Sequence, residues 1–299
     1  MELSSITPST LFRAQLNKGV FYQLFNEYIK DHSAVGKDGI RVEIFEKRYH
    51  SEIDIILRKI KNGSYEFTSY REKLISKGAG KKPRQISIPT VRDKLVLKFV
   101  SELLTIIYPE HVSKPPHELV KDIKNISGKA PKNFKYLRLD IENYYPSIDH
   151  EILIRTLRKR IRIPELLFLI INAIKTPTGE KKDFDNLPTF GVPQGLSISN
   201  ILSSLYLESI DHKYKSIPSI KYYRFVDDIL IIADSETCGD LSKNLPVELE
   251  AKKKITCHKV GEGNKSILVS INNGVDYLGY RFCGKSVEVR QSSFQKMFS

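Results

Sequence analysis

The stretch that decides the fold reads YRFVDDILII and spans residues 223–232. Within this apolar run, Asp227 and Asp228 stand side by side. Two adjacent carboxylates repel each other, and the interior of a strand solvates neither of them. Their placement makes physical sense if they lie at the tight turn of a β-hairpin and face a divalent cation. We therefore predict a hairpin over residues 221–233 whose turn faces a metal.

A third carboxylate, Asp140, ends another predicted strand, over residues 136–141. The alternation of this strand places Leu137 and Leu139 on one face, and Arg138 and Asp140 on the other. Three carboxylates at the ends of neighbouring strands can hold two Mg²⁺ ions roughly 3.5–4 Å apart. Such a pair can activate an attacking hydroxyl and neutralise a leaving pyrophosphate, which is the chemistry of nucleotidyl transfer. A structural hairpin turn that happens to carry Asp-Asp is the alternative.

The composition indicates a folded protein that meets a polyanion. The 299 residues suffice for one large domain or two smaller ones, and 40% of them are hydrophobic and 28% charged, as in globular proteins. The formal net charge is +13, and the commonest polyanionic partner of so basic a protein is nucleic acid. A soluble protein with a merely basic surface is the alternative.

The sequence carries no signal for export or for a membrane span. No apolar run reaches the length of about 18 residues that a span requires, and the N-terminus lacks a basic segment followed by an apolar one. Cys238, Cys257 and Cys283 form no CxxC pair, so neither a disulfide framework nor a zinc knuckle is indicated. We expect a reducing, cytoplasmic setting and no membrane partner.

Helical and strand patterns alternate along the chain without the regular rhythm of a parallel sheet, which indicates an α+β fold with an antiparallel sheet. Asp149 is expected to cap a helix over 150–160, and a β-hairpin is expected within 65–90. The other expected helices cover residues 10–32, 43–62, 91–108, 117–127, 164–174, 198–214 and 242–254. The other expected strands cover 267–271, 277–283 and 286–290.

Several motifs follow one another in a set order: Asp140, GVPQG at 191–195, FVDD at 225–228 and YLGY at 277–280. This order resembles that of reverse transcriptases, and GKKPRQISIPT at 80–90 resembles a fingers motif of the group II intron and retron side of that family. The resemblance covers about residues 35–295. It implies a right-hand polymerase with fingers over 1–135 and a palm over 136–299, in which 221–233 is the catalytic hairpin and 267–290 forms the palm-end strands.

The resemblance also implies the roles of the carboxylates. Asp140, Asp227 and Asp228 match the family's catalytic, metal-binding aspartates, with the carbonyl of Ile141 as a further ligand. The implied cofactor is a pair of Mg²⁺ ions, for which Mn²⁺ is a substitute. Lys265 matches, in a loose alignment, a basic residue that protonates pyrophosphate.

Other residues match the family's nucleotide site. Lys77 and Arg84 match the fingers residues that grip the triphosphate, although two basic residues on a solvated hairpin are the plainer interpretation. Gln194 and Gly195 match the loop that lines the nucleotide and template pocket, and in isolation they would be an ordinary turn. Tyr145 matches the aromatic residue that crowds the sugar 2′ position and so favours dNTPs.

The alternative for Tyr145 is that it and Tyr144 are simply packed aromatics. Phe225, expected to contact the primer, replaces the tyrosine of the family's usual Tyr-x-Asp-Asp. Only about 20 residues follow Tyr280, so we expect a short or absent thumb. This departure, together with a missing Val-Thr-Gly signature, makes the chain similar to the divergent bacterial reverse transcriptases of phage defence and abortive infection.

The expected function is RNA-directed DNA synthesis, in which dNTPs are added to a primer 3′-OH, in bacterial anti-phage defence. The expected partners are an RNA template, a DNA product and dNTPs, with a noncoding RNA or a partner protein in place of the thumb. An oligomer of the chain is a further expectation. Three alternatives remain open: untemplated or protein-primed DNA synthesis, RNA synthesis on the same palm, and a catalytically silent nucleic-acid-binding subunit.

Overall fold

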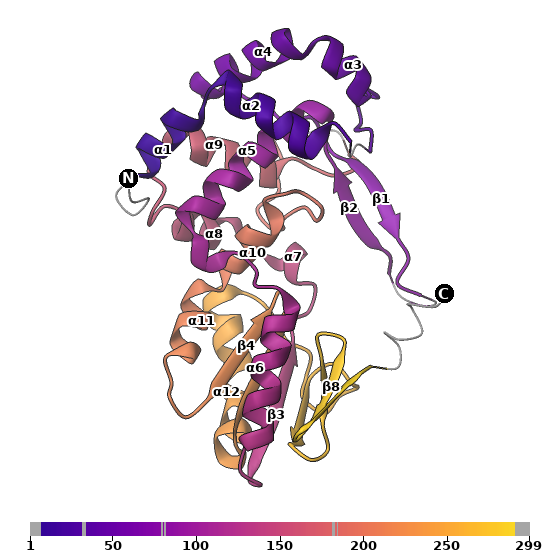
Figure 1. The fold of residues 1–299 in the computed structure, drawn as a ribbon, viewed down its shortest axis with the longest axis vertical. Coiled ribbons are helices and arrows are strands. Elements are labelled where there is room, and N and C mark those ends of the chain that lie inside the picture. Colours follow the sequence, from indigo (N-terminus) through magenta and orange to yellow (C-terminus); the bar gives the residue numbers. More distant parts are fainter. Residues whose placement is uncertain are drawn as a thin grey trace. The chain divides into compact units, whose positions relative to one another are not determined.

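The structure, a computed structural model, describes residues 7–290 apart from 32–33, 79, 81, 181–182 and 184. The chain forms two compact units (Figure 1). Unit 1 comprises Met1–Val112 and Ile148–Leu205, and unit 2 comprises Ser113–Ser147 and Tyr206–Ser299. The division into fingers over 1–135 and palm over 136–299 stays a prediction.

Unit 1 is mainly helical and packs around α5 (Val91–Ile107), whose apolar side chains are almost all buried. The rings of Phe21 and Phe99 lie in its core with centroids 4.9 Å apart. Its helices are α1 (Pro8–Gln15), α2 (Lys18–Leu24), a π-helix (Phe25–Ile29), α3 (Val42–Lys47), α4 (Tyr49–Lys61), α5 (Val91–Ile107), a 3₁₀ turn (Pro109–His111), α8 (His150–Leu157), α9 (Pro164–Lys175) and α10 (Ser199–Tyr206). Asp149 caps α8, as predicted, by accepting from the backbone N–H of Ile152 at 3.0 Å.

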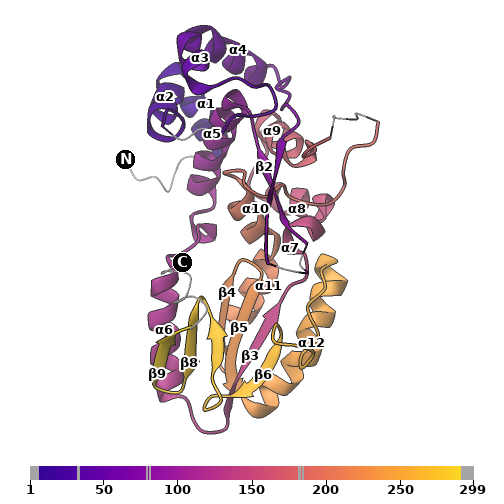
Figure 2. The ribbon, with the colours of Figure 1, turned by 90° about the vertical axis from the view of Figure 1, so that its right-hand side faces the viewer.

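A two-stranded hairpin extends from these helices. Strands β1 (Arg71–Ile75) and β2 (Arg84–Ile88) pair antiparallel, with Arg84 opposite Ile75 (Figures 1 and 2). β1 is exposed along its whole length, whereas Ser87 and Ile88 at the end of β2 are buried. One end of the hairpin is therefore anchored in the unit, and the other reaches into solvent.

Unit 2 is built on a four-stranded antiparallel sheet in the order β4-β5-β3-β6, so the predicted α+β class with an antiparallel sheet is confirmed. The strands are β3 (Phe134–Asp140), β4 (Lys221–Phe225), β5 (Asp228–Asp234) and β6 (Ile267–Ser270). Helix α12 (Ser235–Lys253) contacts β3, β5 and β6, and α11 (Glu208–Lys215) contacts β4 (Figure 2).

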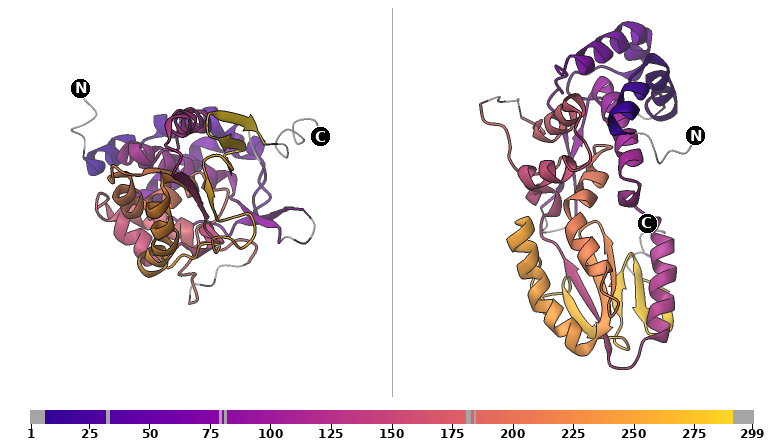
Figure 3. Two further views of the ribbon diagram at one scale, coloured as in Figure 1. Left: turned by 90° about the horizontal axis from the view of Figure 1, so that it is seen from below. Right: turned by 90° about the vertical axis from the view of Figure 1, so that its left-hand side faces the viewer.

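A second, three-stranded sheet completes unit 2 on the side of α6 (Pro116–Lys129). Its strands are β7 (Val275–Tyr277), β8 (Tyr280–Cys283) and β9 (Ser286–Val289), and α6 contacts β8 and β9 (Figure 3). Tyr136, Leu230 and Ile232 of the four-stranded sheet pack with Ile123 of α6 and Phe282 of β8 in one fully buried cluster. Both faces of the four-stranded sheet are thus covered, so polar groups at the ends of its strands lie in a partly dry setting.

Capping residues correct several predicted helix bounds. The expected helix over 10–32 is interrupted at Asn17, whose side chain accepts from Val20 N–H at 3.1 Å and starts α2. Arg48 and Leu207, whose backbones leave the helical region, likewise divide the helices expected over 43–62 and 198–214. Helix α12 begins earlier than predicted because Asp234 accepts from Thr237 N–H at 2.9 Å.

The single strand expected over 277–283 is in fact a tight hairpin of β7 and β8. Its turn residues Leu278 and Gly279 have φ of 52° and 83°. Two positive φ values in succession match the twist of a hairpin and reverse the chain. Leucine rarely adopts a positive φ, so the residue type at Leu278 gives no signal for a turn and the pattern predicts one continuous strand.

No helix in the part of the chain that the structure describes is long and apolar enough to cross a membrane.

Candidate active site

The turn between β4 and β5 holds the Asp-Asp pair in a strained backbone. Phe225 pairs with Asp228, so only Val226 and Asp227 form the turn. Val226 has a φ of 57°, a region that a β-branched residue rarely occupies and that costs about 1–3 kcal/mol. A positive φ at the first central position of a two-residue turn is usually supplied by glycine. The surrounding fold therefore holds this turn in place.

The structure brings the three predicted carboxylates together at one edge of the sheet. Asp140, the last residue of β3, lies opposite Asp228, the first residue of β5. The backbone N–H of Ile141 donates to the carbonyl of Asp227 at 3.0 Å. Because the N–H and C=O of one residue in an extended strand point the same way, the Ile141 carbonyl also faces this turn.

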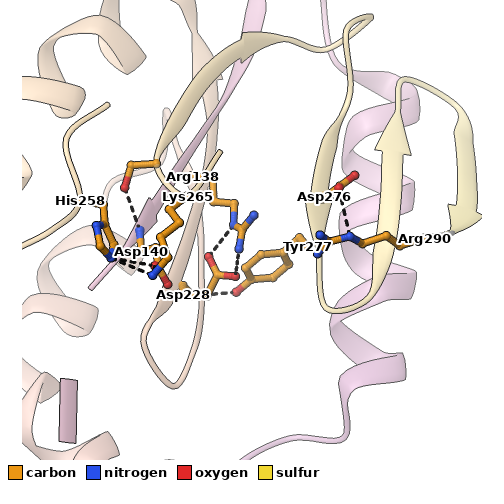
Figure 4. Close-up of polar contacts among 9 residues, drawn as sticks. Arg138, Asp140, Asp228, His258, Lys265, Asp276, Tyr277 and Arg290 are labelled. Atoms are coloured by element: carbon orange, nitrogen blue, oxygen red, sulfur yellow. Dashed lines mark hydrogen bonds and ion pairs between the residues drawn. The ribbon is translucent and has the colours of Figure 1, made fainter. Parts of the chain in front are cut away.

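Asp228 is held by a bidentate ion pair that the sequence did not predict. Arg138 donates from Nε and from Nη2 to its two carboxylate oxygens, each at 2.8 Å (Figure 4). Burial raises the pKa of Asp228 to about 6; Arg138 opposes this shift, and Asp140 and Asp227 add to it. The hydroxyl of Tyr277 donates to the Asp228 carbonyl at 3.0 Å. Asp228 therefore lies between an arginine that stabilises its charged form and two carboxylates that oppose it.

Asp140 lies beside two other basic side chains (Figure 4). Its Oδ2 is 3.0 Å from Nζ of Lys265 and 3.4 Å from Nε2 of His258. Nζ of Lys265 and Nε2 of His258 are 2.9 Å apart, and Glu142 lies 3.3 Å from Nδ1 of the same ring. The side chain of Lys265 is 62% exposed and contacts both a carboxylate and an imidazole.

The oxygen atoms of this cluster are of the kind that Mg²⁺ or Mn²⁺ prefers. Hard divalent cations prefer carboxylate and carbonyl oxygens, and the site offers three adjacent carboxylates together with the carbonyl of Ile141. Asp140, Ile141, Asp227 and Asp228 as metal ligands stay a prediction. Among the described residues, the group that brings three ligand atoms within 4.8 Å of one another is Glu110, His111 and Glu208.

A second buried arginine supports the turn from the opposite face of the sheet. On β4, Arg224 lies opposite Ile229, so its side chain is on the other face of the sheet from Asp228. Its Nε donates to Oδ1 of Asp211 on α11 at 2.8 Å. Its Nη1 donates to the carbonyl of Val226 at 2.9 Å. The side chains of Arg224 and Asp211 are only 6% and 9% exposed. This ion pair therefore fixes the one carbonyl that belongs to the strained residue.

The two neighbouring tyrosines of α7 (Tyr144–Ser147) differ in burial. Tyr144 is buried at 3% exposure, whereas Tyr145 is partly exposed, and their ring centroids lie 5.9 Å apart. Tyr144 is thus packed in the interior and Tyr145 is the more exposed of the two; the role of Tyr145 at the sugar stays a prediction. Phe225 is partly buried against the core cluster of unit 2.

Unit 1 contains the other predicted nucleotide residues. Lys77 and Arg84 are both exposed; Lys77 follows the end of β1, and Arg84 is the first residue of β2. Ala79 and Lys81 lie outside the described residues. The loop of Gln194 and Gly195 lies directly on β2: Ser87 N–H donates to the carbonyl of Gln194 at 2.7 Å. The hairpin and this loop therefore form one structural element.

We expect Gly195→Ala to lower the free energy of unfolding by about 1–3 kcal/mol. Gly195 has a φ of 102°, and a Cβ there would lie 2.8 Å from Cγ2 of Ile86. Urea denaturation measures the effect. Gly239→Ala is the matched control, because Gly239 lies in α12 with no atom within 4 Å of a Cβ, and alanine suits a helix. Equal stabilities of the two variants would contradict the prediction.

Sequence reasoning missed several residues that hold the site. Arg138 gave a signal, because strand alternation places it on the face of Asp140. His258, Arg224 and Asp211 gave none, because their partners are distant in sequence. His150, whose Nε2 lies 2.7 Å from the carbonyl of Gly191, supports the 191–195 loop and was expected only as a helix residue.

Comparison with known families gives one match that covers most of the chain. Residues 75–282 match the model of the reverse transcriptase (RNA-dependent DNA polymerase) family.

Curated relatives include intron-encoded proteins. The group II intron-encoded protein LtrA of Lactococcus lactis subsp. cremoris is 28% identical over 211 residues, which are 67% of this chain and 34% of that protein. An uncharacterized 91 kDa protein in the cob intron of Schizosaccharomyces pombe is 27% identical, over 68% of this chain and 26% of that protein. Protein YkfC of Escherichia coli K12 is 23% identical, over 84% of this chain and 76% of that protein. The chain thus spans about a quarter to a third of the two intron-encoded relatives.

Among solved structures, apo telomerase from Candida tropicalis, truncated from its C-terminal domain, shares the fold with a TM-score of 0.58 at 15% identity. The match covers 75% of this chain and 55% of that one. Telomerase from Candida albicans in complex with a fragment of telomeric RNA gives a TM-score of 0.56 at 15% identity. This match covers 83% of this chain and 51% of that one.

Proposed function

Because the chain belongs to the reverse transcriptase (RNA-dependent DNA polymerase) family, we propose that it is an RNA-directed DNA polymerase that extends a primer with dNTPs. The observation that carries this proposal is the convergence of Asp140, Asp227 and Asp228 at adjacent strand ends. A cluster with the pKa of one carboxylate raised to about 6 is costly to a fold that does not use it.

In the proposed reaction the primer 3′-oxygen forms a bond to the α-phosphorus of a dNTP, and the bond from that phosphorus to pyrophosphate breaks. Asp140, Asp227, Asp228 and the Ile141 carbonyl would hold two Mg²⁺ ions, or Mn²⁺ in their place, which when bound supply Lewis-acid chemistry at the reacting oxygens. Lys265, whose Nζ lies 3.0 Å from Oδ2 of Asp140, would donate a proton to the departing pyrophosphate.

The other proposed roles concern substrate binding. Lys77 and Arg84 would bind the triphosphate through charge-assisted hydrogen bonds. Gln194 and Gly195 would line the nucleotide pocket, supported by their contact with β2. Phe225 would contact the primer beside the Asp-Asp turn.

Tyr145→Ala is expected to relax the choice of sugar. The partly exposed ring of Tyr145 would crowd a 2′-hydroxyl, so its removal should raise NTP incorporation relative to dNTP incorporation by at least about tenfold, or about 1.4 kcal/mol. Single-nucleotide kinetics with matched dNTP and NTP pairs measure this ratio. Tyr145→Phe keeps the ring and should keep the choice; a ratio that does not change in the alanine variant would contradict the role.

The test of the function is extension of a DNA primer on an RNA template with the purified chain. We expect incorporation that stops with EDTA and returns with excess Mg²⁺ or Mn²⁺. Product that stays on the protein after denaturation would point instead to protein priming. Faster incorporation of NTPs than of dNTPs would point to RNA synthesis. Absence of incorporation on every primed template would leave a nucleic-acid-binding subunit and overturn the proposal.

The proposed partners are an RNA template, a DNA product and either a noncoding RNA or a partner protein, and we propose an oligomer of the chain separately. The proposed setting is anti-phage defence in the bacterial cytoplasm. The net charge of +13 supports the nucleic-acid partners. Sequencing of the DNA and RNA that copurify with the protein identifies them, and phage plating on cells with and without the intact carboxylates tests the setting.

A further inference from the structure

Unit 1 contains an open cavity of about 700 Å³ that the proposed reaction does not use. It lies between α1 and the segment that leads into α9, and its floor is apolar, with Phe12, Leu16 and Ile163 at 4%, 8% and 8% exposure. Figure 1 shows α1 and α9 on one side of this unit and the β1–β2 hairpin on the other. The cavity is thus separate from Lys77 and Arg84.

The rim of the cavity is strongly basic. Four of its twelve lining residues are cationic and only one, Glu165, is acidic. We call Arg13, Lys61, Arg160 and Arg162 the cationic rim. Two of its members come from the run RKRIR at residues 158–162, so further positive charge lies next to the cavity.

One member of the cationic rim is fixed, and the others are available. Arg160 forms an ion pair with Glu110, donates to the carbonyl of Ile107 at 3.1 Å and lies over the ring of Tyr108. Among the residues that the structure describes, the other three members form no ion pair with a carboxylate. The positive charge of the rim is therefore largely uncompensated, which favours an anionic ligand.

We propose that this cavity binds a single-stranded RNA segment outside the stretch being copied. Phosphates would lie against the cationic rim, and bases would lie on the apolar floor, the combination by which single strands are held. A cavity of about 700 Å³ has the size of a small-molecule site, so it accepts unpaired nucleotides and excludes a duplex.

Hydrogen-bonding groups in the lining favour RNA over DNA. Thr7, Ser9 and Glu165 place two hydroxyls and a carboxylate along the cavity, and these can bond the ribose 2′-hydroxyl, which distinguishes RNA from DNA. The proposal rests on the proposed function only in taking RNA as the partner, and it requires no catalysis.

The site is tested by comparing RNA binding by two charge-reversal variants. Fluorescence anisotropy without dNTPs measures the affinity for an unstructured labelled RNA of about twelve nucleotides. Lys61→Glu and Lys47→Glu are matched, because each lysine is exposed and is the last residue of a helix, and only Lys61 lines the cavity. We expect Lys61→Glu to weaken binding about tenfold and to reduce the slope of log K against log salt by about 0.7, and Lys47→Glu to leave both unchanged. Equal behaviour of the two variants would overturn the site.

Two further readouts complete the test. RNA carrying 4-thiouridine should photo-crosslink to the peptide that contains Phe12, and crosslinks confined to other peptides would count against the site. Single-stranded DNA of the same sequence should bind more weakly, and equal affinity would remove the assignment to RNA. Single-nucleotide incorporation on a short primed template should persist in Lys61→Glu. If the proposed polymerase function is wrong, the unmodified chain itself incorporates no nucleotide. If the RNA site is wrong, Lys61→Glu and Lys47→Glu bind RNA equally.

Discussion

Replacing Asp227 with asparagine is expected to reduce dNTP incorporation by roughly 10³-fold or more. Asparagine keeps the shape of the side chain and the strained turn, but it removes a full negative charge at the point where Asp140 and Asp228 approach. Hard divalent cations bind a carboxylate oxygen far more strongly than an amide oxygen. The loss of transition-state stabilisation therefore amounts to about 4 kcal/mol.

Primer extension over a range of Mg²⁺ concentrations measures this loss. Asp276→Asn is the matched control, because Asp276 lies in the same unit and pairs with Arg281 and Arg290, and Figure 4 shows it apart from Asp140 and Asp228. The control should extend primers at the normal rate, with at most about 1 kcal/mol of lost stability. An Asp227→Asn enzyme with normal kcat would show that this carboxylate holds no metal and would overturn the proposed site.

Arg224→Lys is expected to lower kcat by about 10²-fold while leaving KM for the dNTP unchanged. Lysine keeps a positive charge beside the buried Asp211, so the large penalty of an unpaired buried charge is avoided. A single ammonium cannot reproduce the planar fork that reaches Asp211 and the Val226 carbonyl together. The turn of Asp227 is then free to relax from its positive φ, which displaces the carboxylate without unfolding the unit.

A rescue experiment separates this role from a general loss of stability. Val226→Gly removes the backbone strain at φ 57°, so adding it to Arg224→Lys should restore most of kcat. Tyr222→Phe is the control, because its hydroxyl bonds the same Asp211 at 2.8 Å but does not touch the turn; it should cost about 1 kcal/mol of stability and no kcat. Failure of the double variant to recover would show that Arg224 acts only on stability.

The sequence predicts best what depends on local pattern. Alternation places Arg138 and Asp140 on one face of β3, and the charge repulsion of Asp227 and Asp228 predicts a turn, both of which the structure has. Asp149 caps α8 as its position indicates. These features follow from residues a few positions apart, so no knowledge of the rest of the chain is needed.

What the sequence misses depends on distant partners or on strained backbone. The clamp of Arg224 on Asp211 and the contact of His258 with Asp140 form only when the chain has folded. The hairpin at Leu278 uses a positive φ at a residue that normally avoids it, so residue type points away from the true turn. Which of the two adjacent tyrosines is buried likewise follows from packing and not from spacing.

The discontinuous course of the chain has a consequence for synthesis on the ribosome. β3 lies between β5 and β6, and it is made long before either of them. At about 5–20 residues per second, both hydrogen-bonding edges of this apolar strand remain open for several seconds before Asp228 can lie beside Asp140. During that interval β3 is able to pair with another chain. The strand that carries the first carboxylate therefore exposes nascent molecules to aggregation until β5 and β6 are made.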